Sequence, residues 1–163
     1  MIVNFLLNKN NEYELIIKNS ISVSFPSFFE NISSNVFNNC QKLEEICLPS
    51  SICKIESLAF KGCTKLKEIT ILSKNIEIGE QAFEDCTSLK IKGNLLKIPN
   101  NLFKECKSLI RIEIPPSVKC IGNYAFYRCI KLKEIEIPSS LEIIGNYAFY
   151  GCIKFKEIEI PLS

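Results

Sequence analysis

Nine cysteines are the residues of this chain with the most evident capacity for chemistry. Cysteine binds zinc or acts as a nucleophile, usually with histidine as a second ligand or as the base. The chain has no histidine and no Cys-x-x-Cys pair, so the sequence predicts no metal site and no Cys–His or Ser–His catalytic pair. The odd count and the wide spacing do not suit a disulfide framework either.

Other groups that support catalysis lack their usual context. The chain contains neither a Gly-x-Gly-x-x-Gly nor a Gly-x-x-x-x-Gly-Lys run, the loops that hold cofactor phosphates. Carboxylates are abundant, but they fall on alternating segments that predict an open sheet surface rather than a pocket. We therefore predict that the chain is not an enzyme and uses no cofactor.

Six of the cysteines belong to a repeat. Phenylalanine recurs in steps of 23, 23, 20, 23 and 23 residues, with isoleucine five residues before it and cysteine three residues after it. Such columns predict stacked coils with the Phe, Ile and Cys side chains in a shared core, where free cysteine packs as a small apolar residue. The alternative, a ladder of disulfides or metal ions, is disfavoured by the missing histidines. The columns are Phe37, Phe60, Phe83, Phe103, Phe126 and Phe149, and Cys40, Cys63, Cys86, Cys106, Cys129 and Cys152.

Each repeat combines two patterns. Residues 132–138 alternate apolar and charged side chains, which predicts a strand with one buried face. Residues 144–152 space their apolar side chains by three and four, which predicts a short helical or 3₁₀ segment. The proline in Pro-x-Ser-Leu ends the strand. The expected fold is an α/β solenoid with a parallel β-sheet on one face and short helical segments on the other.

This unit resembles the BspA-like leucine-rich repeat, which runs roughly Leu-x-x-Ile-x-Ile-Pro-x-Ser-Leu-x-x-Ile-Gly-x-x-Ala-Phe-x-x-Cys. The resemblance covers residue 29 to the C-terminus in about six repeats. It implies a right-handed leucine-rich-repeat solenoid, a sheet on the concave face, helical segments on the convex face, and a role in adhesion or protein binding. Leu72 and Lys74 depart from the usual proline and serine, and the third unit is three residues short between Cys86 and Ile98, which predicts a local shift or bend.

The two ends of the chain are predicted separately. Residues 1–28 lie outside the repeat, and the apolar runs 2–7 and 13–18 predict a capping hairpin before the solenoid of residues 29–163. The sequence stops just after a predicted strand at 158–160. Because solenoids need capped ends, we expect either a fragment or a homo-oligomer formed through the open C-terminal edge.

The outward strand positions are the candidate partner-binding residues. They predict an acidic patch beside a central basic patch, and hence a protein partner with a basic surface. The alternative is a solvated sheet face whose charges were copied with the repeats. A net charge of +2 and the acidic stripe argue against nucleic acid, and no apolar run is long enough to span a membrane. The acidic residues are Glu113, Glu134, Glu136, Glu157 and Glu159, and the basic residues are Lys90, Lys92 and Arg111.

Two further surfaces are weaker candidates: the shortened third repeat, and the tyrosines Tyr124, Tyr127, Tyr147 and Tyr150 of the last two repeats. The predicted function is a protein–protein interaction module, either a scaffold or a regulatory subunit, for instance of a phosphatase. The alternative is a cell-surface adhesion protein. An unoxidised cysteine column, and residues 1–7 without a basic segment or cleavage site, favour a cytoplasmic location.

Overall fold

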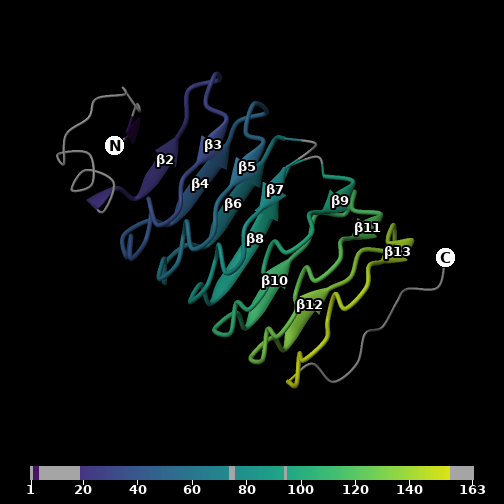
Figure 1. The fold of residues 1–163 in the computed structure, drawn as a ribbon. Coiled ribbons are helices and arrows are strands. Elements are labelled where there is room, and N and C mark those ends of the chain that lie inside the picture. The colour runs from purple at the N-terminus through teal and green to yellow at the C-terminus, as the bar shows by residue number, and fades with distance from the viewer. Residues whose placement is uncertain (1, 4–18, 74–75, 94, 155–163) are drawn as a thin grey trace.

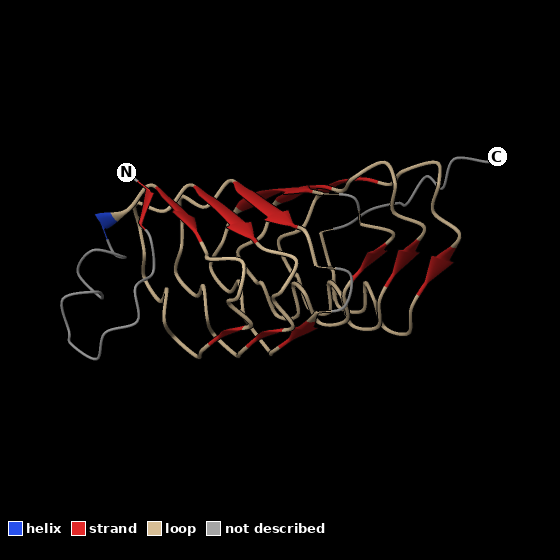
Figure 2. Ribbon diagram, turned by 90° about the horizontal axis from the view of Figure 1, so that it is seen from above, coloured by secondary structure: helices blue, strands red, loops and turns tan. Residues whose placement is uncertain are grey.

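The protein is a stack of coils that follow one another along a single axis (Figure 1). The computed structural model describes residues 2–3, 19–73, 76–93 and 95–154. The longer strands form one seven-stranded parallel sheet, and the shorter strands form two three-stranded parallel sheets. Figure 2 shows the long sheet along one side of the molecule and the short strands on the opposite side, in two separate groups. The predicted parallel-stranded solenoid is confirmed.

The long sheet has the order β1-β2-β4-β6-β8-β10-β12. Its strands are β1 (Ile2–Val3), β2 (Ser22–Ser24), β4 (Glu45–Leu48), β6 (Glu68–Ile71), β8 (Ser88–Lys92), β10 (Arg111–Glu113) and β12 (Glu134–Glu136). The short sheets have the orders β3-β5-β7 and β13-β11-β9. Their strands are β3 (Asn31–Ile32), β5 (Lys54–Ile55), β7 (Glu77–Ile78), β9 (Lys97–Ile98), β11 (Cys120–Ile121) and β13 (Ile143–Ile144).

The predicted helical segments are wrong, because the stretch between each short strand and the following cysteine is a series of turns. Tyr124 and Arg128 have left-handed backbone φ angles of 55°, a conformation that interrupts a helix. The N–H of Phe126, between them, donates to the carbonyl of Ala148 in the next coil at 2.8 Å. Backbone groups that a helix would use internally are therefore used between coils. No helix in the described part of the chain is long and apolar enough to cross a membrane.

Parts of both predicted ends fall outside the described residues. Residues 2–3 pair in parallel with β2, whereas residues 4–18, which contain the rest of the predicted hairpin, are not described. Residues 155–163, with the last predicted strand and the open C-terminal edge, are not described either. The capping hairpin and the end-to-end oligomer remain predictions.

The phenylalanine and cysteine columns form the core, as predicted. The Phe37, Phe60 and Phe83 side chains are fully buried, and successive rings stack with centroids 4.9 and 5.0 Å apart and interplanar angles of 10° and 6°. The Cys129 thiol donates to the carbonyl of Phe103 in the preceding coil at 3.0 Å, and Cys63, Cys86 and Cys152 make the corresponding bonds. Each of these four cysteines therefore fills a small core space and gives a buried carbonyl, which already accepts a backbone N–H, a second donor.

The shortened third repeat changes the register of the long sheet. Ile69 and Ile112 hold the same position in their repeats, yet Ile69 pairs with Ile91 while Ile112 pairs with Leu89. The register thus slips by two residues across β8. Because side chains in a strand alternate with a period of two, this slip keeps the apolar side chains buried.

The same repeat interrupts the short-strand ladder. In intact coils, the N–H of Gly79 donates to the carbonyl of Ile55 at 2.8 Å, and the N–H of Gly122 donates to Ile98 at 2.9 Å. The equivalent residue between them is Pro99, which has no N–H. β7 and β9 consequently belong to different sheets.

The interruption extends around the coil into the turns. Among the described residues, no backbone hydrogen bond joins 76–86 to 97–105. The Phe83 and Phe103 rings are tilted by 53° with centroids 5.7 Å apart, unlike the stacked rings of the first coils. Side chains bridge this junction instead, through hydrogen bonds or ion pairs of Gln81 with Glu105, Glu80 with Lys104, and Asp85 with Ser108.

Gly93, directly after β8, supplies the first testable prediction. Its φ is +115°, and a Cβ at this position would lie 2.2 Å from the carbonyl oxygen of Ile71. We expect Gly93→Ala to lower the free energy of unfolding by about 3 kcal/mol or more, the upper end of the usual range for backbone strain. Urea denaturation measures the change.

Gly151→Arg is the matched control. Gly151 also has a positive φ, but a Cβ there would lie no closer than 3.1 Å to a flexible Arg128 side chain, and Arg128 already adopts φ 55° at the same repeat position. We expect this variant to lower the free energy of unfolding by about 1 kcal/mol, the cost of a left-handed residue that carries a Cβ, and thus by less than Gly93→Ala, which also forces a Cβ against backbone. Equal stability of the two variants would contradict the close approach at Gly93.

The cysteine column supplies the second prediction. Burial raises the pKa of the Cys86 and Cys106 thiols, and deprotonated thiol is the reactive form. We expect a thiol reagent to modify Cys47, Cys53 and Cys120 in the folded protein, because these side chains are exposed or half-buried. The six column cysteines should react after unfolding in denaturant. Rapid modification of the column without denaturant would contradict its place in the core.

Candidate functional site

The outer face of the long sheet carries the charged positions predicted from the sequence. Strand alternation turns the apolar side chains inward and leaves the charged ones at the surface, as in β4 and β8. Directly paired positions form one row across the sheet, here called the charged row. From β4 to β12 it consists of Glu45, Glu68, Lys90, Glu113 and Glu136.

The register slip at β8 corrects the predicted arrangement of this face. Counting by repeats places Lys90 in one column with Thr70, whereas in the structure Lys90 lies opposite Glu68 and Lys92 lies opposite Thr70. On its other side Lys90 lies opposite Glu113. A lysine therefore separates two pairs of carboxylates within the charged row.

The predicted acidic and basic patches are one interleaved network rather than two patches. The Lys90 ammonium lies 2.6 Å from a carboxylate oxygen of Glu113, and Lys92 lies 2.8 Å from Glu68. The Arg111 guanidinium lies 3.4 to 3.7 Å from the carboxylates of Glu113, Glu134 and Glu136. Of the other predicted residues, Glu157 and Glu159 lie outside the described part of the chain.

Electrostatic contacts shift the pKa values of the central pair. The hydrogen bond from Lys90 lowers the pKa of Glu113, with smaller contributions from the charges of Lys90 and Arg111. The same hydrogen bond raises the pKa of Lys90. The side chains of Glu134 and Glu136 are 63% and 82% exposed, so these two carboxylates are accessible to a binding partner even while Arg111 contacts them.

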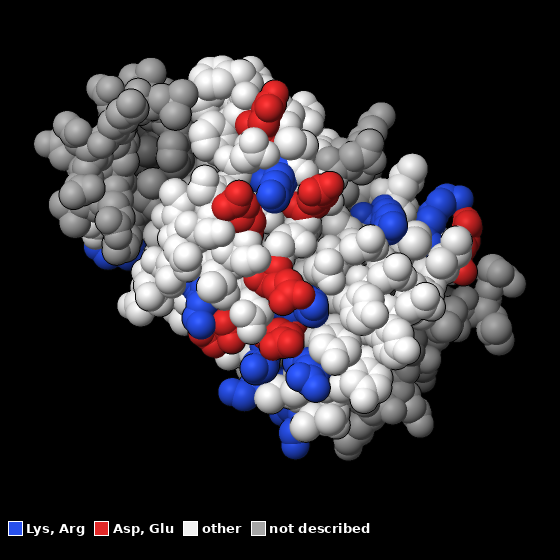
Figure 3. Space-filling model, viewed as in Figure 1, with Lys and Arg blue, Asp and Glu red and all other residues white. Residues whose placement is uncertain are grey.

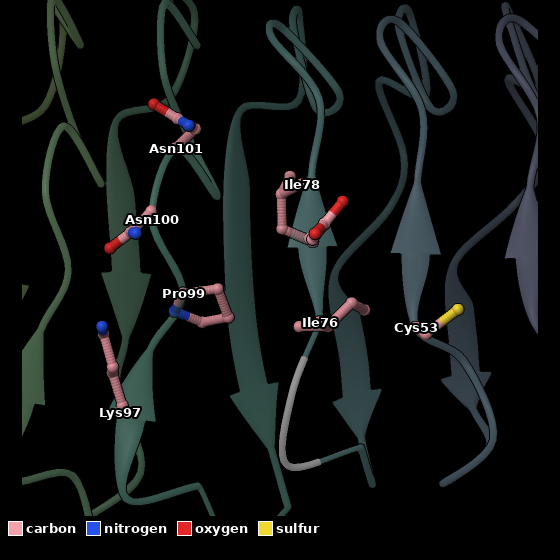
Figure 4. A pocket seen from close by; sticks show the side chains of 8 residues that line it. Cys53, Ile76, Ile78, Lys97, Pro99, Asn100 and Asn101 are labelled. Atoms are coloured by element: carbon pink, nitrogen blue, oxygen red, sulfur yellow. The ribbon is translucent and has the colours of Figure 1, made fainter.

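A cleft of about 660 Å³ opens on the short-strand side, at the junction between β7 and β9. Ile76 and Ile78 lie on one side of it, and Lys97 and Pro99 lie on the other (Figure 4). Sequence reasoning pointed to the shortened repeat but missed the cleft itself. The signal that could have found it is Pro99, because the other residues at this repeat position have a backbone N–H that can donate to the preceding coil. Cys53, Glu77, Asn100 and Asn101 complete the lining.

The tyrosines form two exposed stacks on the turns of the last two repeats. The Tyr124 and Tyr147 rings stack at 5.4 Å, and the Tyr127 and Tyr150 rings stack at 5.5 Å. The Arg128 guanidinium lies over the Tyr127 ring at 5.3 Å, within the range of a cation–π contact. The rings contact one another, but Tyr147 and Tyr150 remain 58% and 57% exposed, and a binding role for them remains a prediction.

Outside the charged row and the cleft, charged and metal-ligating side chains are dispersed over the described surface. On the face shown in Figure 3, acidic and basic side chains are interspersed and neither sign covers a wide area. Within the described ranges, no three Cys, Asp or Glu side chains gather closely enough to hold a metal ion. The charged row and the cleft are thus the two places where the irregular repeat produces a distinctive surface.

Comparison with known sequences gives a family match over most of the chain. A family model described as BspA type leucine-rich repeat region matches in six copies over residues 11–93 and 96–163. No curated protein matches the chain.

One solved structure shares the fold, and two others align over most of this chain. A leucine-rich repeat protein from Eubacterium ventriosum aligns at 21% identity with a TM-score of 0.55, over 88% of this chain and 46% of that protein. A leucine-rich cell surface protein from Faecalibacterium prausnitzii aligns at 31% identity with a TM-score of 0.49, over 83% of this chain and 37% of that protein. The T. pallidum leucine-rich repeat protein aligns at 24% identity with a TM-score of 0.48, over 96% of this chain and 83% of that protein. This chain spans less than half the length of the first two.

The central ion pair of the charged row supplies a third prediction. Because Lys90 is the main cause of the lowered Glu113 pKa, replacing it by methionine should raise that pKa toward the ordinary glutamate value, about 4.3. Carboxyl-carbon NMR titration of wild type and Lys90→Met measures the change directly. An unchanged Glu113 pKa in Lys90→Met would contradict the ion pair. The control is Lys119→Met, which removes a lysine from the short-strand side and should leave the Glu113 pKa unchanged.

Proposed function

The chain belongs to the family of BspA-type leucine-rich repeat proteins, and on that premise we propose that it binds a protein partner with a basic surface through the outer face of its long sheet. The observation that carries the proposal is the charged row. Four of its five positions from β4 to β12 are carboxylates, and the register slip brings them into line.

Folding does not account for this row. Glu45 lies directly opposite Glu68, and Glu113 lies directly opposite Glu136, although like charges at directly paired strand positions destabilise a sheet. Lys90, Lys92 and Arg111 offset part of this repulsion through their ion pairs. Glu45 and Glu136 are exposed, whereas Glu68 and Glu113 are half-buried and paired with lysines. A partner with a basic surface would supply positive charge to the exposed carboxylates and relieve the remaining repulsion.

The shape of the face favours a macromolecule over a small ligand. The charged side chains lie on neighbouring strands of an open sheet, about 4.8 Å apart from strand to strand. Small-molecule sites are concave and mostly apolar, whereas a broad charged face suits a folded protein surface. The excess of carboxylates repels nucleic-acid phosphates. We accordingly propose a binding role without catalysis, either as a scaffold or as a regulatory subunit.

Adhesion at a cell surface is the setting for partner binding that membership of the BspA-type family favours. The predicted cytoplasmic location rested on the free cysteine column and on residues 1–7, which lack a basic segment and a cleavage site. Because those six side chains are buried in the core, they are shielded from oxidants in any compartment. The column therefore does not favour the cytoplasm, and cell-surface adhesion is the better-supported setting for partner binding.

Charge reversal on the sheet supplies the fourth prediction. Glu134→Lys/Glu136→Lys replaces the two most exposed acidic side chains of the network and leaves the core untouched. In affinity capture from the source organism and its surroundings, we expect the wild type to retain a partner that this variant loses. Binding of that partner should weaken as salt rises from about 0.05 to 0.5 M, because the Debye length shortens over this range.

Glu80→Lys/Glu142→Lys is the matched control. It makes the same change in net charge, and each of its glutamates likewise pairs with a cationic side chain, here a lysine, but neither lies in the long sheet. Circular dichroism and urea denaturation establish that both variants are folded. Equal loss of the partner from both variants, or binding indifferent to salt, would contradict the charged row as the binding surface.

A further inference from the structure

The cleft between β7 and β9 has no role in the proposed function, because it opens on the short-strand side and contains none of the charged row. Elsewhere in the short-strand sheets, each strand pairs with the equivalent strand one repeat away. At this junction the ladder stops on both sides. Two strand edges therefore face a cleft of about 660 Å³.

The edge of β7 offers backbone groups in strand geometry. The N–H groups of Glu77 and Gly79 donate to Cys53 and Ile55 of the preceding coil, both at 2.8 Å. In a parallel ladder, successive residues direct their backbone groups to opposite sides. The N–H and C=O of Ile78, and the C=O of Ile76, are consequently directed toward the cleft. Among the described residues, neither isoleucine has a backbone hydrogen bond on that side.

The edge of β9 differs, because Pro99 removes the donor that an intact coil would use. Proline is a common means of protecting a strand edge from pairing. β9 is protected in this way, whereas β7 is not. Of the two edges, β7 is therefore the one that can accept an additional strand.

We propose that the cleft between β7 and β9 binds a short extended peptide segment of another protein, which adds to β7 as a parallel strand. The bound segment donates to the carbonyls of Ile76 and Ile78 and accepts from the N–H of Ile78. The volume of about 660 Å³ is typical of a ligand site. Strand addition to an exposed edge is a general mode of peptide recognition, in which backbone bonds supply the affinity.

The lining also indicates the side chains that the segment should carry. Ile76 and Ile78 present apolar surface on one side, while Glu77 and Lys97 place one charge of each sign at the rim. In the intact ladder the corresponding residues, Lys54 and Ile55, alternate exposed and buried. The preferred segment therefore alternates polar and apolar residues, with an apolar side chain beside Ile78.

The test is selection from a phage-displayed library of linear heptapeptides on the wild-type protein, followed by synthesis of the enriched peptides. Each peptide is then methylated at one backbone nitrogen at a time, and its affinity is measured by fluorescence anisotropy. N-methylation of the amides that face β7 should weaken binding by at least about tenfold, the effect of one backbone hydrogen bond lost. Methylation of the alternate amides should change binding by less than about twofold, and bound peptide should slow exchange of the Ile78 amide proton.

Two tryptophan variants locate the site. Lys97→Trp places a bulky side chain at the rim of the cleft and should reduce affinity by at least about tenfold. Lys54→Trp makes the same change at the same repeat position of β5, which is paired on both sides, and should bind as the wild type does. Glu134→Lys/Glu136→Lys should also bind the peptide with wild-type affinity. Loss of peptide binding in the cleft can therefore be distinguished from loss of partner binding on the long sheet.

Three results would each overturn the proposal. One is a library selection without enriched peptides, and another is equal affinity of Lys97→Trp and the wild type. The third is N-methylation that weakens binding at consecutive rather than alternate positions, because that pattern indicates side-chain recognition instead of an added strand.

Discussion

Backbone hydrogen bonds between successive coils are the interaction on which the rest of the structure depends. They run from a residue to a partner about one repeat away, both in the parallel sheets and in the turns, as in the bond from the N–H of Phe126 to the carbonyl of Ala148. Each coil thereby satisfies the polar groups of its neighbours and excludes water from the stacked phenylalanines. The cysteines complete the arrangement, because their thiols donate to phenylalanine carbonyls that would otherwise be buried without a second donor.

This dependence explains which features could be predicted from the sequence. The repeat of Phe, Ile and Cys determined the coils, the core and the parallel strands, since these follow from periodicity alone. The predicted helices failed because spacings of three and four also occur in a chain of turns. The sequence does not reveal directly that the backbone groups near Tyr124 and Arg128 bond between coils rather than within a helix.

The candidate surfaces were harder to predict for a related reason. Six of the eight predicted charged residues lie at the surface of described long strands, and Glu157 and Glu159 lie outside the described residues. Counting by repeats, however, assumed one constant register. The slip at β8 moves Glu113 and Glu136 into line with Glu45 and Glu68, with Lys90 between them. Register depends on how the shortened coil packs against two neighbours at once, and a repeat count carries no information about that. The cleft likewise lies where the shortened repeat and Pro99, which lacks an N–H, interrupt the short-strand ladder.

The charged row and the cleft therefore have a common origin in one irregular coil. Near-identical repeats favour uniform surfaces, because each copy places the same side chain at the same position along its strand. Shortening one repeat breaks this uniformity twice: it offsets the long sheet by two residues on one side, and it accompanies a break in the ladder on the other. The long sheet remains continuous through β8, so the stack tolerates the break while keeping its core. In this protein the regular coils supply stability, and the irregular coil supplies the two surfaces for which we propose binding.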